Sequence, residues 1–371
     1  MKVSFVSPRL YRYISPNSQK PAGGAQRQQS MISTQLASRG YDVSAIVADY
    51  GHSDCGRHGG VKLIKGVPET LSGMSSVLKA VYSLARSMHT VDADVYLVRG
   101  APRLATTAFL ISKVLQKRFT FRVANDADVD PSYLKDRYNQ FFSYLYRVSI
   151  SNADIVIAQT RKQRQLLRNN FGVEAKIVPN GYDLPPSSEL LPHRERGYVL
   201  WVGSSDPDKK NPYLFLRLAK QVPGVSFKMI SQPIPGNENF HEEIKKETTS
   251  VSNLDFIGTV APDEVHSYYR EAMLLVNTSN YKGFPNTFLE AWRYETPIVS
   301  LYFDLDGLLG KNRCGIRAGT MEALIKVVKI IISDPSTRSK LGKNGRTYMK
   351  KSFSLDMVVD SYEKAFSYDT N

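Results

Sequence analysis

Residues 2–48 read KVSFVSPRLYRYISPNSQKPAGGAQRQQSMISTQLASRGYDVSAIVA. The stretch begins with a short β-rich apolar run at Lys2–Ser7 and crosses a loop rich in proline and glycine. It continues through Ala25–Arg39, where apolar residues recur at helical spacing, to a second apolar run at Asp42–Ala48. A strand, a helix and a strand in succession form a βαβ unit, which predicts a parallel sheet with helices on both faces.

The same alternation continues toward the C-terminus and predicts a second sheet. Further strands are expected at Asp94–Val98, Phe119–Val123, Ile155–Ala158 and Lys176–Val178, and after residue 196 at Tyr198–Gly203, Val225–Ile230, Leu254–Ile257, Met273–Asn277 and Pro297–Leu301. Residues 184–196 are rich in proline, serine and charge without periodicity, which is typical of a linker. We therefore expect an α/β protein of two doubly wound domains, 1–183 and 197–371, joined by a linker at 184–196. Their ligand is expected in a shared cleft at the carboxyl ends of the strands. Whether the last helix packs back on the first domain is left open.

Composition narrows the class of partner. The 371 residues are 42% hydrophobic and 23% charged, which is ordinary for a globular protein, and the net charge is +14. Such a charge favours a phosphorylated ligand or an acidic membrane surface. Nucleic acid is disfavoured, because no arginine-rich tract and no motif of interleaved aromatic and basic residues occurs.

Location is predicted from the cysteines and from the apolar segments. Cys55 and Cys314 show neither metal-ligand nor redox spacing, which favours a reducing cytoplasm. No segment is long enough for a signal-peptide core or a membrane span, so membrane contact is expected to be peripheral. Ser76–Met88 would suit it as a basic amphipathic helix on the inner membrane face, although an ordinary domain helix explains the pattern too.

Four stretches, in this order, carry a family resemblance. They are Gly23-Gly24-Ala25-Gln26 after the first strand; the strand 153–158 followed by Pro179-Asn180-Gly181-Tyr182-Asp183; Trp201-Val202-Gly203 with two lysines downstream; and KGFPNTFLEAW at 282–292. Together they resemble the retaining glycosyltransferases of family 4 (glycosyl transferases group 1), which have the GT-B architecture of two Rossmann-like domains. The turn at 179–183 is interpreted as structural, because Asn-Gly suits a positive φ.

The resemblance implies a donor site built mainly from the second half. Gly23 and Gly24 would let backbone N–H groups approach a phosphate at a helix start, although a plain loop explains them equally. In the family, an arginine and a lysine after the glycine of the third motif neutralise the departing diphosphate. This chain has Ser204 after Gly203 and keeps a lysine; Lys209 is chosen for that role, and Lys210 is interpreted as a surface lysine.

The fourth motif resembles the family's two glutamates separated by seven residues. Backbone amides of Gly283, Phe284, Pro285-Asn286 and Thr287 would surround the phosphates, with proline supplying no N–H, and Glu290 would accept hydrogen bonds from the ribose. Lys282 stands where the first glutamate is expected. Three interpretations are open: Lys282 pairs with the charge of an anionic donor sugar, it reaches the diphosphate in place of the arginine missing at Ser204, or the substitution marks a loss of activity.

Polar residues at the ends of two strands of the first domain complete the candidates. Asn125, Asp126 and Asp128 follow a strand where many family members carry a histidine, and Arg99 ends the preceding strand. The alternative is a capped polar loop. Catalytic candidates are Lys209, Glu290, Lys282, Asn125 and Asp126; donor-binding candidates are Gly23, Gly24, Gly203, Ser204, Lys209, Gly283, Phe284, Pro285, Asn286, Thr287 and Glu290; acceptor-binding candidates are Arg99 and Asp128.

The resemblance predicts transfer of a sugar from a UDP- or GDP-linked donor to a glycan or lipid-linked acceptor, with retention, in surface polysaccharide or glycoconjugate synthesis. Neither metal nor cofactor is expected: Asp126 and Asp128 have metal-site spacing, but GT-B enzymes do not use one. Acceptor choice is expected in the loops Pro8–Pro21 and Gly51–Pro68. Two alternatives remain, a nucleotide-sugar epimerase or phosphorylase, and a catalytically impaired GT-B protein that acts as a binding or regulatory subunit. The sugar, the base, the acceptor, the linkage and the oligomeric state are not predicted.

Overall fold

The computed structural model describes residues 1–14, 24–51, 56–68, 73–261, 264–280 and 284–367. It divides the chain into two compact units. Unit 1 contains Met1–Gly181 and returns at Leu355–Asn371, and unit 2 contains Tyr182–Ser354.

Unit 1 is built on an eight-stranded sheet with the order β3-β4-β2-β1-β5-β6-β7-β8. The strands are β1 (Lys2–Val6), β2 (Asp42–Asp49), β3 (Arg57–His58), β4 (Val61–Pro68), β5 (Val95–Arg99), β6 (Arg118–Arg122), β7 (Ile155–Ala158) and β8 (Lys176–Ile177). Apart from the short β3, which pairs antiparallel with β4, every pairing is parallel. The order runs outward from β1 in both directions, which is a doubly wound sheet.

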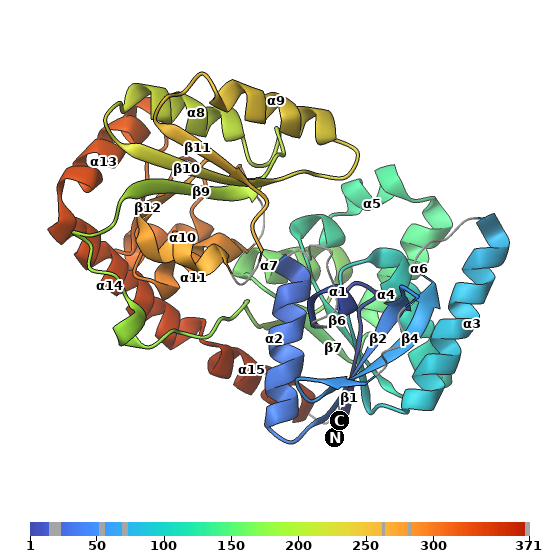
Figure 1. The fold of residues 1–371 in the computed structure, drawn as a ribbon. Helices are drawn as coiled ribbons and strands as arrows, with labels where there is room; N and C mark the ends of the chain where they lie inside the picture. The colour runs from blue at the N-terminus through green and yellow to red at the C-terminus, as the bar shows by residue number, and fades with distance from the viewer. Residues whose placement is uncertain (15–23, 52–55, 69–72, 262–263, 281–283, 368–371) are drawn as a thin grey trace. The chain divides into compact units, whose positions relative to one another are not determined.

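Helices cover both faces of this sheet because its strands alternate their apolar side chains (Figure 1). Val3 and Phe5 of β1 pack with α2 (Gly24–Ser38) and α15 (Leu355–Ser367) in one core. Val6 lies in the other core. That core includes residues of α3 (Gly73–Val91), α4 (Pro102–Val114), α5 (Pro131–Arg137), α6 (Gln140–Ser151) and α7 (Arg161–Phe171). The short α1 (Tyr11–Ile14) follows β1.

Unit 2 is built on a six-stranded, all-parallel sheet with the order β11-β10-β9-β12-β13-β14. Its strands are β9 (Tyr198–Ser204), β10 (Ser226–Gln232), β11 (Leu254–Gly258), β12 (Ala272–Asn277), β13 (Ile298–Ser300) and β14 (Gly315–Arg317). Its helices are α8 (Pro212–Gln221), α9 (Glu238–Thr248), α10 (Val265–Glu271), α11 (Asn286–Arg293), α12 (Leu308–Lys311), α13 (Met321–Ser333) and α14 (Pro335–Ser352). Trp201 of β9 packs against Phe215 of α8 in its core.

The turn at Pro179-Asn180-Gly181 ties three elements of unit 1 together. The buried Arg122 of β6 donates to the Pro179 carbonyl and, at 2.8 Å, to the Asn180 side chain. Gln28 of α2 exchanges two hydrogen bonds of 3.0 Å with the Gly181 backbone. A Cβ at Gly181 would lie 2.7 Å from Val358 of α15, so glycine permits that helix to approach closely.

The structure differs from the sequence-based expectations in three places. The expected loop Gly51–Pro68 contains β4, because Val61–Pro68 pairs with β2 along most of its length. Several further elements of the structure were not predicted from the sequence: β3, β14, α1, α5, α7, α12 and α15. Residues 184–196 pack on unit 2: Arg196 is buried there and donates to the Tyr294 carbonyl at 2.7 Å and to Thr296 Oγ1 at 2.9 Å.

Candidate functional site

Two neighbouring strands of unit 2, β9 and β12, end at loops that are bonded to each other. Gly203 and Ser204 are the last residues of β9, and the loop 205–211 follows them. Thr278, just after β12, accepts a hydrogen bond from Trp201 Nε1 at 2.9 Å and donates to the Lys210 carbonyl at 2.7 Å. The Asn280 N–H donates to the Lys209 carbonyl at 3.1 Å. The third sequence motif and its lysines are therefore bonded to the loop that leaves β12, at the carboxyl edge of this sheet, where parallel α/β sheets bind ligands.

Asp206 folds the loop that follows β9. Its Oδ1 accepts from the N–H groups of Asp208 at 3.1 Å and Lys209 at 2.9 Å. Its carbonyl accepts from the N–H groups of Lys210 and Asn211. Asn211 then adopts a left-handed conformation with φ 49° immediately before α8. Asp206 thus has a structural role, and the direction of each lysine follows from this turn.

The two lysines of this loop have different surroundings. The Lys209 side chain is 69% exposed, and its Nζ lies 3.8 Å from Asp206 Oδ2. Lys210 is half-buried; burial lowers its pKa below the ordinary value, and the nearby Asp206 carboxylate opposes that shift. A partly desolvated ammonium interacts more strongly with a phosphate than an exposed one. Spacing alone favours Lys209 for the diphosphate, and the structure shows Lys210, interpreted from sequence as a surface lysine, to be the more buried of the two. Two adjacent residues of the same type give no sequence signal for this difference.

A buried polar network beside this loop was not anticipated from sequence. Ser205 directly follows β9, and its Oγ lies 2.8 Å from the Oγ of Ser231 in β10. The same Ser205 Oγ lies 2.7 Å from Nδ1 of His241 in α9. Ser205 and Ser231 are fully buried. The His241 ring packs edge-on against Phe256 of β11. The network joins the ends of β9 and β10 to α9 next to Ser204, and no spacing in the sequence relates its members.

The helix α11 begins at Asn286 beside these loops. The N-cap residue is Pro285, whose side chain forms no capping hydrogen bond, and Asn286 and Thr287 are half-buried. The first N–H groups of a helix lack intrahelical acceptors and carry a positive partial charge, so this end suits a phosphate. Gly23, Lys282 and Gly283 lie outside the described residues.

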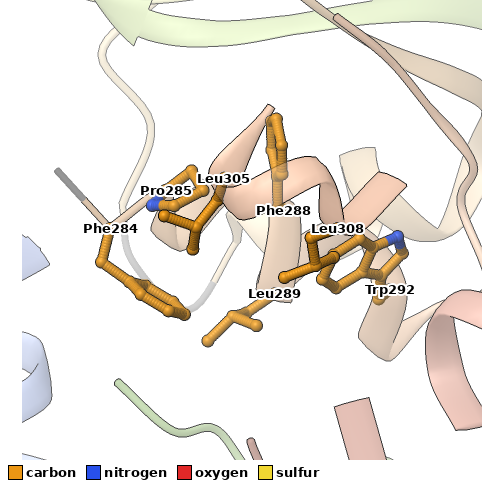
Figure 2. Close-up of a pocket in the computed structure, with 7 residues that line it drawn as sticks. All are labelled: Phe284, Pro285, Phe288, Leu289, Trp292, Leu305 and Leu308. Atoms are coloured by element: carbon orange, nitrogen blue, oxygen red, sulfur yellow. The ribbon is translucent and has the colours of Figure 1, made fainter. Parts of the chain in front are cut away.

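Apolar packing holds this helix in place (Figure 2). Phe284, Pro285, Phe288, Leu289 and Trp292 line a cavity together with Leu305 and Leu308. Its volume is only about 10 Å³, roughly the space of one water molecule. The cavity therefore belongs to the apolar support of α11. Of the predicted donor-binding residues, Phe284 and Pro285 contribute side chains to that support.

Glu290 lies in the second turn of α11 and is 8% exposed. The fully buried Tyr269 of α10 donates its hydroxyl proton to Glu290 Oε2 at 3.0 Å. Thr296 Oγ1 in turn donates to the Tyr269 carbonyl at 2.6 Å. The hydrogen bond from a neighbouring helix thus orients the carboxylate, and it adds Tyr269, which sequence spacing does not indicate, to the candidate site residues.

In unit 1, the polar residues after β6 bind mainly to their own loop. Asp128 Oδ2 accepts from the N–H groups of Ala124 at 2.7 Å and Asn125 at 3.0 Å, and the Asn125 side chain accepts from the Ala127 N–H at 2.9 Å. Burial raises the pKa of Asp128, and the two backbone N–H groups counteract that shift. Asp126 pairs with Lys162 at 2.8 Å and accepts from Gln163 at 3.2 Å. This is a capped polar loop.

Arg99 connects this loop to the first turn of α2. Its guanidinium donates to the Ala25 carbonyl at 3.1 Å and to Gln159 Oε1 at 3.3 Å. Gln159 donates to the carbonyls of Val123 and Ala124. Since Gly24 begins α2, the structure brings the predicted residues Gly24, Arg99 and 125–128 to one edge of the sheet of unit 1.

No group of three or more His, Cys, Asp or Glu side chains in the described part of the chain is arranged to hold a metal ion. None of the described helices has the length and apolar character needed to cross a bilayer.

Comparison with known families matches both halves of the chain. Residues 22–185 match Glycosyltransferase Family 4, and residues 196–334 match Glycosyl transferases group 1. An uncharacterized glycosyltransferase of Haemophilus influenzae is 20% identical over 92% of this chain and 96% of its own length. One from Methanocaldococcus jannaschii is 24% identical over 65% of this chain and 66% of its own length. The capsular polysaccharide biosynthesis glycosyltransferase CapM of Staphylococcus aureus is 23% identical over 56% of this chain and 48% of its own length.

Solved structures show the same fold. Sucrose-phosphate synthase from Thermosynechococcus elongatus aligns with a TM-score of 0.78 at 16% identity, over 99% of this chain and 98% of that one. Anabaena HepE in complex with UDP-glucose aligns with a TM-score of 0.74 at 16% identity, over 99% of both chains.

Proposed function

The chain belongs to glycosyltransferase family 4, with the GT-B fold and a group 1 glycosyltransferase domain, and on that basis we propose that it moves a sugar from a nucleotide-diphosphate sugar to a glycan or lipid-linked acceptor. One observation carries the proposal. In unit 2, the partly buried Lys210 lies in a loop bonded to the residues that follow β12, and the same β12 leads through the chain to α11, which begins at Asn286 and contains the buried Glu290.

We assign the roles from the chemistry of each group. The diphosphate binds to the N–H groups at the start of α11 and to the Lys210 ammonium. Negative charge on the diphosphate increases there as its bond to the sugar breaks. Glu290, oriented by Tyr269, accepts hydrogen bonds from the ribose hydroxyls. Ser204 contributes a hydroxyl where the family resemblance predicts an arginine, so more of the charge stabilisation falls on Lys210 and α11.

The proposed reaction retains the configuration of the sugar. The bond between the anomeric carbon and the diphosphate oxygen breaks, and the acceptor hydroxyl oxygen forms a new bond on the same face. Its proton passes to the leaving phosphate, so the pair of catalytic carboxylates found in glycosidases is not required. The transfer, as proposed, uses neither a metal nor a cofactor, and the donor carries UDP or GDP.

The likeness to a capsular polysaccharide enzyme supports a place in surface polysaccharide or glycoconjugate synthesis. We propose that this occurs in the cytoplasm, with membrane contact at the periphery. The free Cys314 is buried, which fits a reducing compartment.

The test measures binding before turnover. Thermal shifts of the purified protein with UDP, GDP, ADP and CMP should show stabilisation by one diphosphate nucleotide, because a ligand of the folded state raises its stability. Lys210→Ala should weaken that binding roughly tenfold or more, as loss of a charged hydrogen bond costs about 1.5–3 kcal/mol. Lys209→Ala is the matched control and should bind nearly as the unaltered chain does.

Turnover is then assayed with the sugar conjugates of the nucleotide that binds. Hydrolysis or transfer with retained anomeric configuration supports the proposal. Binding without any turnover would favour an impaired GT-B binding subunit, and no binding of any nucleotide would count against both functions.

A further inference from the structure

One helical side of unit 1 exposes large apolar side chains. We name the exposed side chains of α3, α4, α5 and α6 the α3–α6 face. It includes Leu78 (66% exposed) and Tyr82 (70%) on α3, Val114 (83%) on α4 and Phe141 (71%) on α6, with Val77 and Val81 beside the first two. On the opposite side of the sheet, Met357 is the one large apolar side chain exposed on the described residues of α2 and α15. The exposed apolar surface is therefore concentrated on one side.

The helices that carry this face are neighbours. They contribute to a single core on one side of the sheet (Figure 1). Since each helix buries its inner side in that core, its exposed residues point away from the sheet. On α3, Val77 and Val81 lie four residues apart, as do Leu78 and Tyr82, so each pair projects from adjacent turns.

The same face is strongly basic. The four helices contain seven lysines and arginines but one acidic residue, Asp136. Lys113 pairs with Asp154 of unit 1. The other six, Lys79, Arg86, Arg103, Lys135, Arg137 and Arg147, are exposed, and none forms an ion pair with a described residue. Their charge is thus available to an anionic partner.

This combination of side chains limits the kind of partner. A second copy docked symmetrically on this face would place mainly like charges against each other, because the four helices contain one acid, Asp136, and six basic residues without an ion pair to a described residue. Nucleic acid would use the basic groups but would leave Leu78, Val81 and Val114 in water. An anionic bilayer surface suits both the apolar and the basic side chains of this face, because apolar and aromatic side chains enter the interface while lysine and arginine contact the headgroups.

We infer that the α3–α6 face binds peripherally to an anionic lipid bilayer, with Leu78 and Tyr82 entering the interface. This interaction is separate from the donor site, which lies in unit 2. It extends the membrane contact expected for Ser76–Met88 alone to a face of four helices, and it would keep the enzyme close to a lipid-linked acceptor.

The experiment is co-sedimentation of the full chain with phosphatidylcholine vesicles, with and without phosphatidylglycerol, at low and physiological salt. We expect binding to the anionic vesicles that salt weakens. The double variant Lys79→Ala/Arg86→Ala should lower the partition coefficient for anionic vesicles roughly 25-fold, because each basic residue near the surface contributes about 1 kcal/mol to binding. Leu78→Ser/Tyr82→Ser should also reduce binding, and Val114→Ser/Phe141→Ser provides a second apolar test on other helices.

Lys329→Ala/Ile330→Ser on α13 of unit 2 is the matched control, since both residues are exposed there. It should sediment as the unaltered chain does. Equal sedimentation with neutral and anionic vesicles, no sedimentation, or no effect of the variants would overturn the inference. So would a dimer in light scattering that Leu78→Ser/Tyr82→Ser converts to a monomer, because the face would then join two copies. Nucleotide-induced thermal shifts, unchanged in every variant, keep this test independent of the proposed function.

Discussion

His193 is a buried residue, and neither of its ring nitrogens has a hydrogen-bond partner among the described residues. Burial, together with the charges of Arg196, Arg338 and Lys343, lowers its pKa to about 3. Below pH 6.5 the unfolded chain binds a proton at this position that the folded chain does not bind. The unfolding free energy should therefore fall by about 1.4 kcal/mol per pH unit from roughly pH 6 toward the folded pKa.

This prediction is checked by denaturant unfolding of the chain and of His193→Phe at pH 7.5 and 5.5. The aromatic ring keeps the packing but does not titrate, so the variant should lose about 1.4 kcal/mol less over that interval. The exposed His89, changed to phenylalanine, serves as control. If the unfolding free energies of the unaltered chain and of His193→Phe depended on pH in the same way, His193 would not be the source of the loss of stability at low pH.

Glu290 and Tyr269 are predicted to act as a pair. Glu290→Gln keeps an acceptor for the Tyr269 hydroxyl but removes the charge, so nucleotide binding should weaken roughly 10- to 100-fold. Tyr269→Phe leaves the Glu290 carboxylate less well oriented and should weaken nucleotide binding roughly 2- to 10-fold. Calorimetric Kd values of both variants and of the double variant check the coupling; strictly additive losses would contradict it.

At the scale of elements, packing between α11 and α14 depends on glycines in α14. A Cβ at Gly342 would lie 1.8 Å from the Glu295 carbonyl oxygen, and one at Gly345 would lie 2.1 Å from the Trp292 ring. Gly342→Ala should thus lower the unfolding free energy by roughly 2–4 kcal/mol, because backbone must shift.

The matched control is Gly310→Ala on α12, where no atom lies within 4 Å of the added Cβ. That change should be neutral or raise stability by less than about 1 kcal/mol. Thermal unfolding of the two variants makes the comparison, and similar melting temperatures would show that α14 can move away at little cost.

At the scale of the whole molecule, the C-terminal helix belongs to the N-terminal unit. Leu355, Val358 and Tyr362 of α15 lie in the core of unit 1. Arg39 at the end of α2 pairs with Asp356, Asp360 and Glu363. Removing residues 355–371 should therefore destabilise unit 1, although the deletion lies at the other end of the chain.

Hydrogen exchange read by mass spectrometry checks this. Peptides from β1, β5 and β6 should exchange faster in the shortened chain, while peptides from β9 and β12 should change little. Equal loss of protection in both units would mean that they unfold together.

The sequence by itself determined the class of fold, the two parallel sheets and the position of the main motifs. In residues 2–48 and 198–301, short apolar runs alternate with segments whose apolar residues have helical spacing. Such runs form buried parallel strands only if helices cover both faces of the sheet, so the local pattern by itself predicts the fold of each unit. Family membership followed from the same motifs.

Tertiary structure alone decided which side chains meet. Lys209 and Lys210 are identical in sequence, and the turn made by Asp206 places one in solvent and leaves the other half-buried. The pairing of Tyr269 with Glu290 joins two helices, and the pairing of Arg39 with α15 joins residues more than three hundred positions apart. Periodicity along a chain reports which face of an element is buried, but contacts between elements depend on how those faces pack in space.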